Sequence, residues 1–380
     1  WLIALLAVAL LALAGWWRMS PTEDEALSAI AMLESPPAEG FARADSPRIF
    51  SFPEDFGPHS NFQTEWWYYT GNLETEDGRH FGYQLTFFRR ALLPEDQLPQ
   101  RQSQWAGQHI YMAHFALTDT QAGQHYASER FSRGEPGLAG AQSQPFEVWL
   151  EDWRIEQTDS RQFTLFAQAE NAKIQLTLED HKAPILHGDA GLSQKGPEAG
   201  NASYYFSQTR LSSQGSISVD GESYAVKGLS WMDHEFSTSA LSTGQIGWDW
   251  FSIQLDDGRE LMLFQLRRSD GLPDPYSSAT LIEVDGSTQH FTAEDFTLTE
   301  LDHWQSPRSE ARYPIGWRIE IAALDLHLET HALLPDQELE LSFTYWEGAA
   351  EIRGNQGSQM LSGMGYIEMT GYALSMEGQF

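Results

Sequence analysis

The sequence predicts an all-β protein, on the evidence of its turn spacing, its strand-like alternation and its many aromatic residues. From Phe50 onward, aromatic and β-branched runs recur every ~8 to 12 residues between Gly-containing turns, which is typical of a β-sandwich or barrel. Aromatic residues make up 13% of the chain. Their apolar bodies and polar tips suit both barrel walls and ligand pockets. Few segments show a sustained helical period.

The first half of the chain is predicted to be a series of hairpins. Two aromatic strands, 65–73 and 80–90, flank the turn Glu76-Asp77-Gly78. Asp220-Gly221 is a strong signal for a two-residue hairpin turn. The strands expected in this half lie within residues 65–73, 80–90, 109–119, 125–133, 147–157, 162–170, 172–180 and 216–236.

The second half repeats this pattern, with turns at Asp257-Gly258 and Asp285-Gly286. The strands expected here lie within residues 247–268, 279–291, 317–333, 339–354 and 363–374. Residues 237–245 have little pattern and form the best internal boundary. The sequence therefore predicts an N-terminal β-domain over residues 47–238 and a C-terminal β-domain over residues 239–380.

The beginning of the chain is an uncharged apolar run over residues 1–17, followed by an acidic, Pro-containing stretch over residues 18–46. The run is long for the core of a signal peptide and short for a membrane span of about 20 residues. It predicts a signal peptide or membrane anchor, followed by a linker, in an exported protein of the periplasm or cell envelope. The alternative is a buried helix of the fold.

Composition and the absence of several motifs exclude classes of function. The formal net charge of −31 would repel nucleic acid, so no nucleic-acid partner is expected. The chain has no cysteine, and its twelve histidines include no HExxH pattern, so we expect neither a metal nor a thiol nucleophile. A nucleophile elbow and a phosphate-binding loop are also missing. We therefore expect no cofactor and no serine hydrolase.

The segment GLSWMDHEF, residues 228–236, carries the strongest functional signal. Side chains alternate along a strand, so Asp233 lies on one face with Trp231, and His234 lies on the other. We predict Asp233 and His234 as catalytic residues, which requires a bulge or domain junction to bring them together. The alternative is a buried, hydrogen-bonded Asp–His pair that joins the two domains.

Further residues are candidates for a ligand pocket. Glu65 can be a pocket carboxylate or the partner of an arginine such as Arg89, and His114 can be a ligand contact or a satisfied core residue. Gln265 can add a polar contact. The predicted ligand-binding residues are Glu65, Trp67, Tyr69, His114, Trp231, Trp248, Trp250 and Gln265.

Several long blocks of the sequence resemble the AttH-like and carotenoid 1,2-hydratase (CrtC-type) family. The blocks cover residues 52–73, 81–89, 111–119, 137–141, 228–236, 247–258 and 345–354. The resemblance implies two tandem lipocalin-like (calycin) β-barrels, packed side by side, that handle an apolar small molecule. It also implies either a companion of an ABC transporter permease or a hydratase that adds water to a carbon–carbon double bond.

Only some of the residues expected in the hydratases are matched in this sequence. Its Asp-His pair matches Asp233 and His234, but Phe236 stands where we expect Trp in the hydratases. A further Tyr and Asp of the hydratases have no clear counterpart in residues 264–271 beyond Asp270. We therefore expect a protein that binds an isoprenoid- or lipid-like molecule near the domain junction and serves an ABC transporter. The alternatives are a cofactor-independent hydratase or isomerase, a hydro-lyase in class, and a purely structural envelope protein.

In the hydratase alternative, each group has a chemical role. Asp233 would be the acid that protonates the double bond, and His234 would hold or activate water. The rings of Trp231, Trp248 and Trp250 would face the developing carbocation, because aromatic faces attract positive charge.

Overall fold

The computed structural model describes residues 39–97, 108–134, 137–239 and 241–378. The apolar run 1–17 and most of the predicted linker 18–46 lie outside the described residues. Within the described part, no helix combines the length and apolar character needed to cross a membrane. The helices there are the short 3-10 turns η1 (Glu54–Phe56), η2 (Glu95–Gln97) and η3 (Ala322–Leu324).

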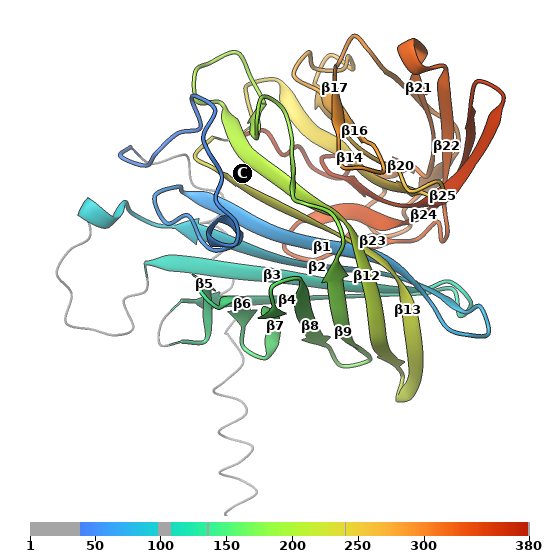
Figure 1. Cartoon of the computed structure of the whole chain (residues 1–380), viewed down its shortest axis with the longest axis horizontal. Helices are drawn as coiled ribbons and strands as arrows, with labels where there is room; N and C mark the ends of the chain where they lie inside the picture. The colour runs from blue at the N-terminus through green and yellow to red at the C-terminus, as the bar shows by residue number, and fades with distance from the viewer. Residues whose placement is uncertain (1–38, 98–107, 135–136, 240, 379–380) are drawn as a thin grey trace, which may run out of the picture.

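The all-β prediction is confirmed, because two large antiparallel sheets account for the fold (Figure 1). Sheet A, with 13 strands, has the order β4-β3-β2-β1-β13-β12-β9-β8-β7-β6-β5, and β10 and β11 pair with β12. Its strands are β1 (Thr64–Glu74), β2 (His80–Ala91), β3 (His109–Asp119), β4 (Gln124–Arg133), β5 (Ala139–Ser143), β6 (Phe146–Leu150), β7 (Trp153–Asp159), β8 (Gln162–Gln168), β9 (Ala172–Asp180), β10 (Ile185–Leu186), β11 (Leu192–Gln194), β12 (Ala202–Val219) and β13 (Glu222–Ser237).

Sheet B has 10 strands in the order β17-β16-β15-β14-β25-β24-β22-β21-β18, with β23 paired to β24. Its strands are β14 (Gln245–Leu255), β15 (Glu260–Arg268), β16 (Ser278–Ile282), β17 (Thr288–Thr292), β18 (Thr297–Glu300), β21 (Gly316–Ile321), β22 (Leu326–Ala332), β23 (Glu338–Glu340), β24 (Thr344–Gln356) and β25 (Gln359–Met369). A small hairpin joins β19 (His303–Gln305) to β20 (Arg312–Pro314). The chain passes from sheet A to sheet B between Ser237 and Gln245.

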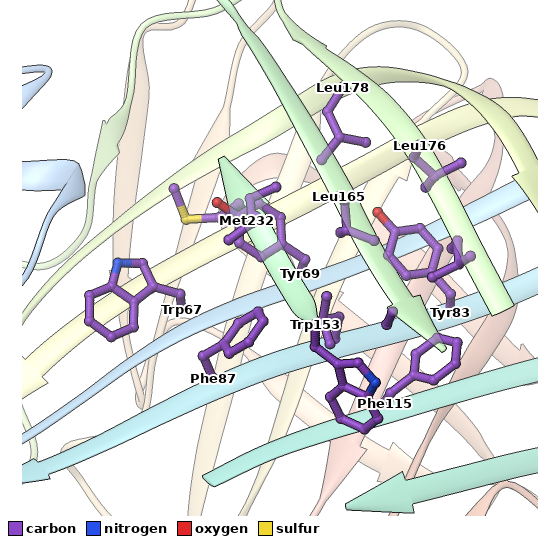
Figure 2. Close-up of a cluster of buried hydrophobic side chains, with 14 of the residues drawn as sticks. Trp67, Tyr69, Tyr83, Phe87, Phe115, Trp153, Leu165, Leu176, Leu178 and Met232 are labelled. Atoms are coloured by element: carbon purple, nitrogen blue, oxygen red, sulfur yellow. The ribbon is translucent and has the colours of Figure 1, made fainter. Parts of the chain in front are cut away.

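Sheet A curls into a nearly closed barrel with a filled interior, whereas sheet B forms a half-barrel (Figure 1). The alternation of buried and exposed side chains in β6 to β9 places one face of each strand inside the barrel. The interior residues labelled in Figure 2 are Trp67, Tyr69, Tyr83, Phe87, Phe115, Trp153, Leu165, Leu176, Leu178 and Met232. These side chains occupy the barrel interior.

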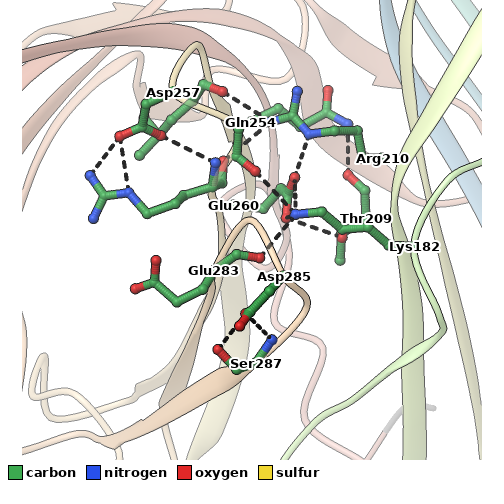
Figure 3. Close-up of polar contacts among 12 residues, drawn as sticks. Lys182, Thr209, Arg210, Gln254, Asp257, Glu260, Glu283, Asp285 and Ser287 are labelled. Atoms are coloured by element: carbon green, nitrogen blue, oxygen red, sulfur yellow. Dashed lines mark hydrogen bonds and ion pairs between the residues drawn. The ribbon is translucent and has the colours of Figure 1, made fainter.

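The two sheets pack face to face, and this packing explains why β1 is apolar on both faces. Its side chains at Trp67 and Tyr69 fill barrel A, and Tyr68 packs against Trp250 of sheet B, with 5.1 Å between ring centroids. At one end of the interface, Arg210 of β12 and Lys182, in the loop between β9 and β10, both pair with the buried Glu260 of β15 (Figure 3).

The local predictions were confirmed where the turn chemistry was explicit. Val219 pairs with Glu222 across the Asp220-Gly221 turn, whose two residues have positive φ angles. A single element had been expected over 147–157, but a turn at Glu151 splits it into β6 and β7.

Candidate active site between the sheets

A cavity of about 150 Å³ lies between the outer face of sheet A and the facing side of sheet B. The lining is rich in aromatic residues, and it includes four carboxyl side chains and one lysine. The aromatic side chains that line it are Trp66, Tyr68, Phe88, Tyr205, Trp248, Trp250, Phe264, Phe343 and Tyr345. The charged ones are Asp233, Glu235, Glu347, Glu368 and Lys195, joined by His114.

Asp233 lies in the wall that sheet A provides and is almost fully buried. Its carboxylate accepts hydrogen bonds from the Tyr205 hydroxyl at 2.7 Å, from Nε1 of Trp231 at 2.7 Å and from the Ser207 hydroxyl. Burial raises the pKa of Asp233 to about 7, even though these three hydrogen bonds favour the ionised form. At neutral pH this carboxyl group therefore exists in both protonation states, which suits an acid–base catalyst.

The partners of Asp233 extend into a network that joins the two sheets. Nε1 of Trp250, on β14, donates to the Tyr205 hydroxyl at 3.0 Å. His187 lies 2.7 Å from the Ser207 hydroxyl and 3.1 Å from the Thr280 hydroxyl of β16. Burial lowers the pKa of His187 to about 3, so its ring is neutral and donates only one of these hydrogen bonds. This network holds the Asp233 carboxylate in one orientation.

Two further carboxyl groups, which the sequence analysis missed, face the cavity from sheet B. Glu347 on β24 and Glu368 on β25 are direct cross-strand neighbours. Glu347 is fully buried and accepts a hydrogen bond from the Tyr68 hydroxyl of β1. Burial raises the pKa of Glu347 well above its usual range, and the charge of Glu368 raises it further. Burial also raises the pKa of Glu368 to about 8.

A signal for Glu347 was present in the sequence. It is the only charged residue of the run Tyr345 to Ala350, which is otherwise apolar and therefore buried. A carboxyl group in such a run is costly unless it is paired or protonated.

Lys195, in the loop between β11 and β12, is the only Lys or Arg that lines the cavity in the described chain. Its Nζ lies 3.4 Å from Oε1 of Glu235 and 3.8 Å from the centroid of the Phe264 ring. Burial lowers the pKa of Lys195, and the charge of Glu235 opposes that effect. This amine is thus already paired with one of the four carboxyl groups.

The structure brings together about half of the predicted site residues. Asp233, His114, Trp248 and Trp250 line the cavity, and Trp231 contacts it indirectly by donating to Asp233. His114 is held between the Tyr345 hydroxyl, 2.6 Å from Nδ1, and the Glu129 carboxylate, 3.2 Å from Nε2.

The predicted joint site of Asp233 and His234 was wrong. The pairing of β13 with β1 is regular from Trp231 to Ser237, so no bulge rotates either side chain. His234 therefore points into barrel A, where its ring lies 4.9 Å from that of Trp67. The alternative of a hydrogen-bonded Asp–His pair was also wrong, since His234 bonds to Glu65 instead.

The residues of β1 that were predicted to bind a ligand lie on the strand face away from this cavity. Glu65, Trp67 and Tyr69 point into barrel A, and the cavity is lined by Trp66 and Tyr68. Both faces of β1 are apolar, so alternation alone could not choose between them. Gln265 is likewise on the far face of β15 from the cavity, which Phe264 and Leu266 line.

Glu65 belongs to a separate buried cluster at the end of barrel A. The expected partner Arg89 is confirmed, with its Nε 2.8 Å from Oε2 of Glu65. His59 and His234 lie 2.8 and 2.9 Å from Oε1, and the three side chains have the composition of a metal site. The distances are those of hydrogen bonds, and burial of Glu65 is offset by Arg89 and both histidines, which keep its pKa well below the usual range. Within this network, two buried nitrogen atoms, Nη1 of Arg89 and Nδ1 of His234, have no hydrogen-bond partner among the described residues.

Comparison with known proteins places this architecture in a family. A family model for AttH-like proteins matches residues 43–372. The chain belongs to the AttH-like family. A solved structure of a putative AttH from Nitrosomonas europaea is 34% identical, with a TM-score of 0.77, over 89% of this chain and 99% of that one.

More distant structures share the fold of this AttH-like chain. Kievitone hydratase from Nectria haematococca is 16% identical with a TM-score of 0.66, over 89% of this chain and 98% of that one. CghA is 12% identical with a TM-score of 0.53, over 90% and 97% of the two chains. A comparison with curated protein sequences finds no match. The tandem lipocalin-like fold expected from the sequence is therefore confirmed.

Proposed function

We propose that this AttH-like protein is a cofactor-independent hydro-lyase that adds water to a carbon–carbon double bond of an apolar small molecule. The reaction would take place in the cavity between the sheets. The observation that carries the proposal is Asp233, a buried carboxyl group with a pKa of about 7 in an aromatic wall. A hydratase among the structures of the same fold supports it.

The geometry assigns a role to each wall. A protonated Asp233 would give its proton to one carbon of the double bond, and the rings of Trp66, Trp248 and Trp250 would stabilise the resulting carbocation. Water would then add to the cation and lose a proton to the Asp233 carboxylate, which restores the acid. His234, which lies inside barrel A, has no direct part in this reaction.

Turnover of candidate alkenes tests the proposal. We would incubate the protein with kievitone and with lycopene-like polyenes in water enriched in heavy oxygen, and analyse the products by mass spectrometry. We expect a product that has gained one labelled water, and loss of at least about 100-fold in rate for Asp233→Asn, which cannot donate the proton.

The matched control is Asp249→Asn. Asp249 is also fully buried on a strand of the interface, with a pKa raised to about 6 by burial, but it pairs with Arg267 and does not line the cavity. This variant should retain activity. Unchanged turnover in Asp233→Asn would refute the assignment of Asp233 as the acid. If none of the alkenes gave labelled product although the protein bound them tightly, the protein would be a binding protein and not a hydratase.

A further inference from the structure

The Glu347 end of the cavity contains an acceptor with no donor. Oε1 of Glu347 takes the hydrogen bond from Tyr68, but Oε2, which is buried, has no hydrogen-bond partner of normal geometry among the described residues. The Tyr345 hydroxyl lies near Glu347 and also lies 2.6 Å from Nδ1 of His114. A buried carboxylate oxygen left without a donor costs free energy, so a donor from a ligand would be bound favourably there. The Glu368 carboxyl group lies on the neighbouring strand, directly opposite.

The charges around this end favour a donor that is also a cation. The other titratable groups that line the cavity are Asp233 and Glu235 from β13, Tyr68 from β1, Tyr205 from β12, Tyr345 from β24, His114 from β3 and Lys195 from its loop. Only Lys195 among them is a lysine or arginine, and it is paired with Glu235. Three carboxyl groups are thus left without a cationic partner in a cavity walled by aromatic rings, which themselves attract cations.

We propose that the Glu347–Glu368 end of the cavity binds the protonated amine of an organic amine, whose apolar body lies against Trp248, Trp250 and Phe264. The ammonium group donates one hydrogen bond to Oε2 of Glu347 and lies beside Glu368. This inference deepens the proposed function by naming the head group of the substrate, and it rests on that function only in treating the same cavity as the ligand site.

Binding of the amine has a proton balance that can be measured. Without a ligand, the two adjacent carboxyl groups hold at least one proton between them at neutral pH, because burial and their mutual repulsion raise both pKa values. When the ammonium ion arrives, both carboxyl groups become carboxylates, and the protons that they held leave to solvent. One proton or more is therefore released for each amine bound, and the amine keeps its own protons.

The test uses three probes of similar size, namely phenethylamine, phenethyl alcohol and hydrocinnamate, which differ in the charge of the head group. Titration calorimetry at pH 7, repeated in buffers with different ionisation enthalpies, measures both affinity and proton release. We expect phenethylamine to bind about tenfold or more tightly than the alcohol, in line with a charge-assisted hydrogen bond, and hydrocinnamate to bind weakest.

Variants connect that preference to the two carboxyl groups. Glu347→Gln and Glu368→Gln should each reduce the preference for the amine about tenfold and lower the number of protons released. Glu351→Gln is the matched control, because Glu351 lies on the same strand, is half-exposed and does not line the cavity. If Glu347→Gln does not fold, as thermal unfolding would show, the less buried Glu368→Gln decides the question.

Equal affinity for the amine and the alcohol would overturn the inference, as would a preference that both variants retain. Failure of the proposed function is a separate result. Amine binding with proton release but no hydrated alkene would contradict the hydratase and support the inference. Hydration of kievitone or polyenes without any preference for the amine would support the hydratase and contradict the inference.

Discussion

At the scale of single residues, this AttH-like chain places ionisable groups where burial makes them costly. Asp233 is held by three donors and still has a pKa near 7, so its burial outweighs its hydrogen bonds. Glu65 shows the opposite balance, because Arg89 and two histidines more than compensate for its burial. The first group can exchange a proton at neutral pH, and the second stays ionised as part of the framework.

The pKa of Asp233 leads to a prediction about stability against pH. The folded protein binds the proton of Asp233 up to about pH 7, whereas the unfolded chain releases it near pH 4. Between these values the native state holds more protons, so the free energy of unfolding falls as the pH rises, by at most about 4 kcal/mol from this group. Urea unfolding from pH 4 to pH 8 should show a steeper loss for the wild type than for Asp233→Asn. Parallel curves would contradict the raised pKa.

At the scale of strands, close approach of β2 and β24 fixes the spacing of the two sheets. A Cβ atom at Gly82 would lie 2.6 Å from Cβ of Ala349, which is closer than two carbon atoms can pack. Glycine is therefore needed at this position because it has no side chain to keep the two sheets apart.

Gly82→Ala tests this contact. We expect a loss of about 1–3 kcal/mol in the free energy of unfolding, typical of overpacking, together with weaker ligand binding as the sheets separate. Adding Ala349→Gly should restore part of both, because it removes the atom that clashes. The measurement is a double-mutant cycle by urea unfolding. Additive effects of the two substitutions would show that the sheets do not meet at this pair.

Strand patterns explain which parts of the site could be predicted. Alternation in GLSWMDHEF placed Asp233 and His234 on opposite faces, and the structure has them so. It could not choose a face of β1, and it missed most of β12, whose first half mixes polar and aromatic residues without a clear period. The bond between Tyr68 and Glu347 joins residues 279 positions apart. Such a pairing depends on how the two sheets dock, which no local pattern encodes.

At the scale of the whole molecule, the two sheets are joined by buried polar contacts as well as by aromatic packing. Glu260 of β15 is fully buried and accepts hydrogen bonds from Arg210 of β12 and from Lys182 in the loop between β9 and β10 (Figure 3). At the same end, Nε2 of Gln254 donates to the carbonyl oxygen atoms of Thr209 and Ser230, at 2.7 and 3.0 Å. These contacts fix the relative position of the cavity walls.

Glu260→Gln should therefore weaken the docking of the sheets. It leaves two cations without their buried partner, which typically costs about 3 kcal/mol or more. The control is Asp257→Asn in the same hairpin, where Asp257 pairs with Arg259 at the surface and the expected loss is below about 1 kcal/mol. Urea unfolding measures both. A loss in Glu260→Gln no larger than in the control would mean that apolar packing alone holds the sheets.

The filled interior of barrel A has a consequence for how such a protein can diversify. The cavity is lined by side chains that point away from the barrel, so the residues that fill the core and those that line the cavity alternate along the same strands. Substitutions at one set leave the packing of the other intact. Substitutions in the cavity lining can thus change which molecules fit the cavity without changes to the hydrophobic core of the barrel.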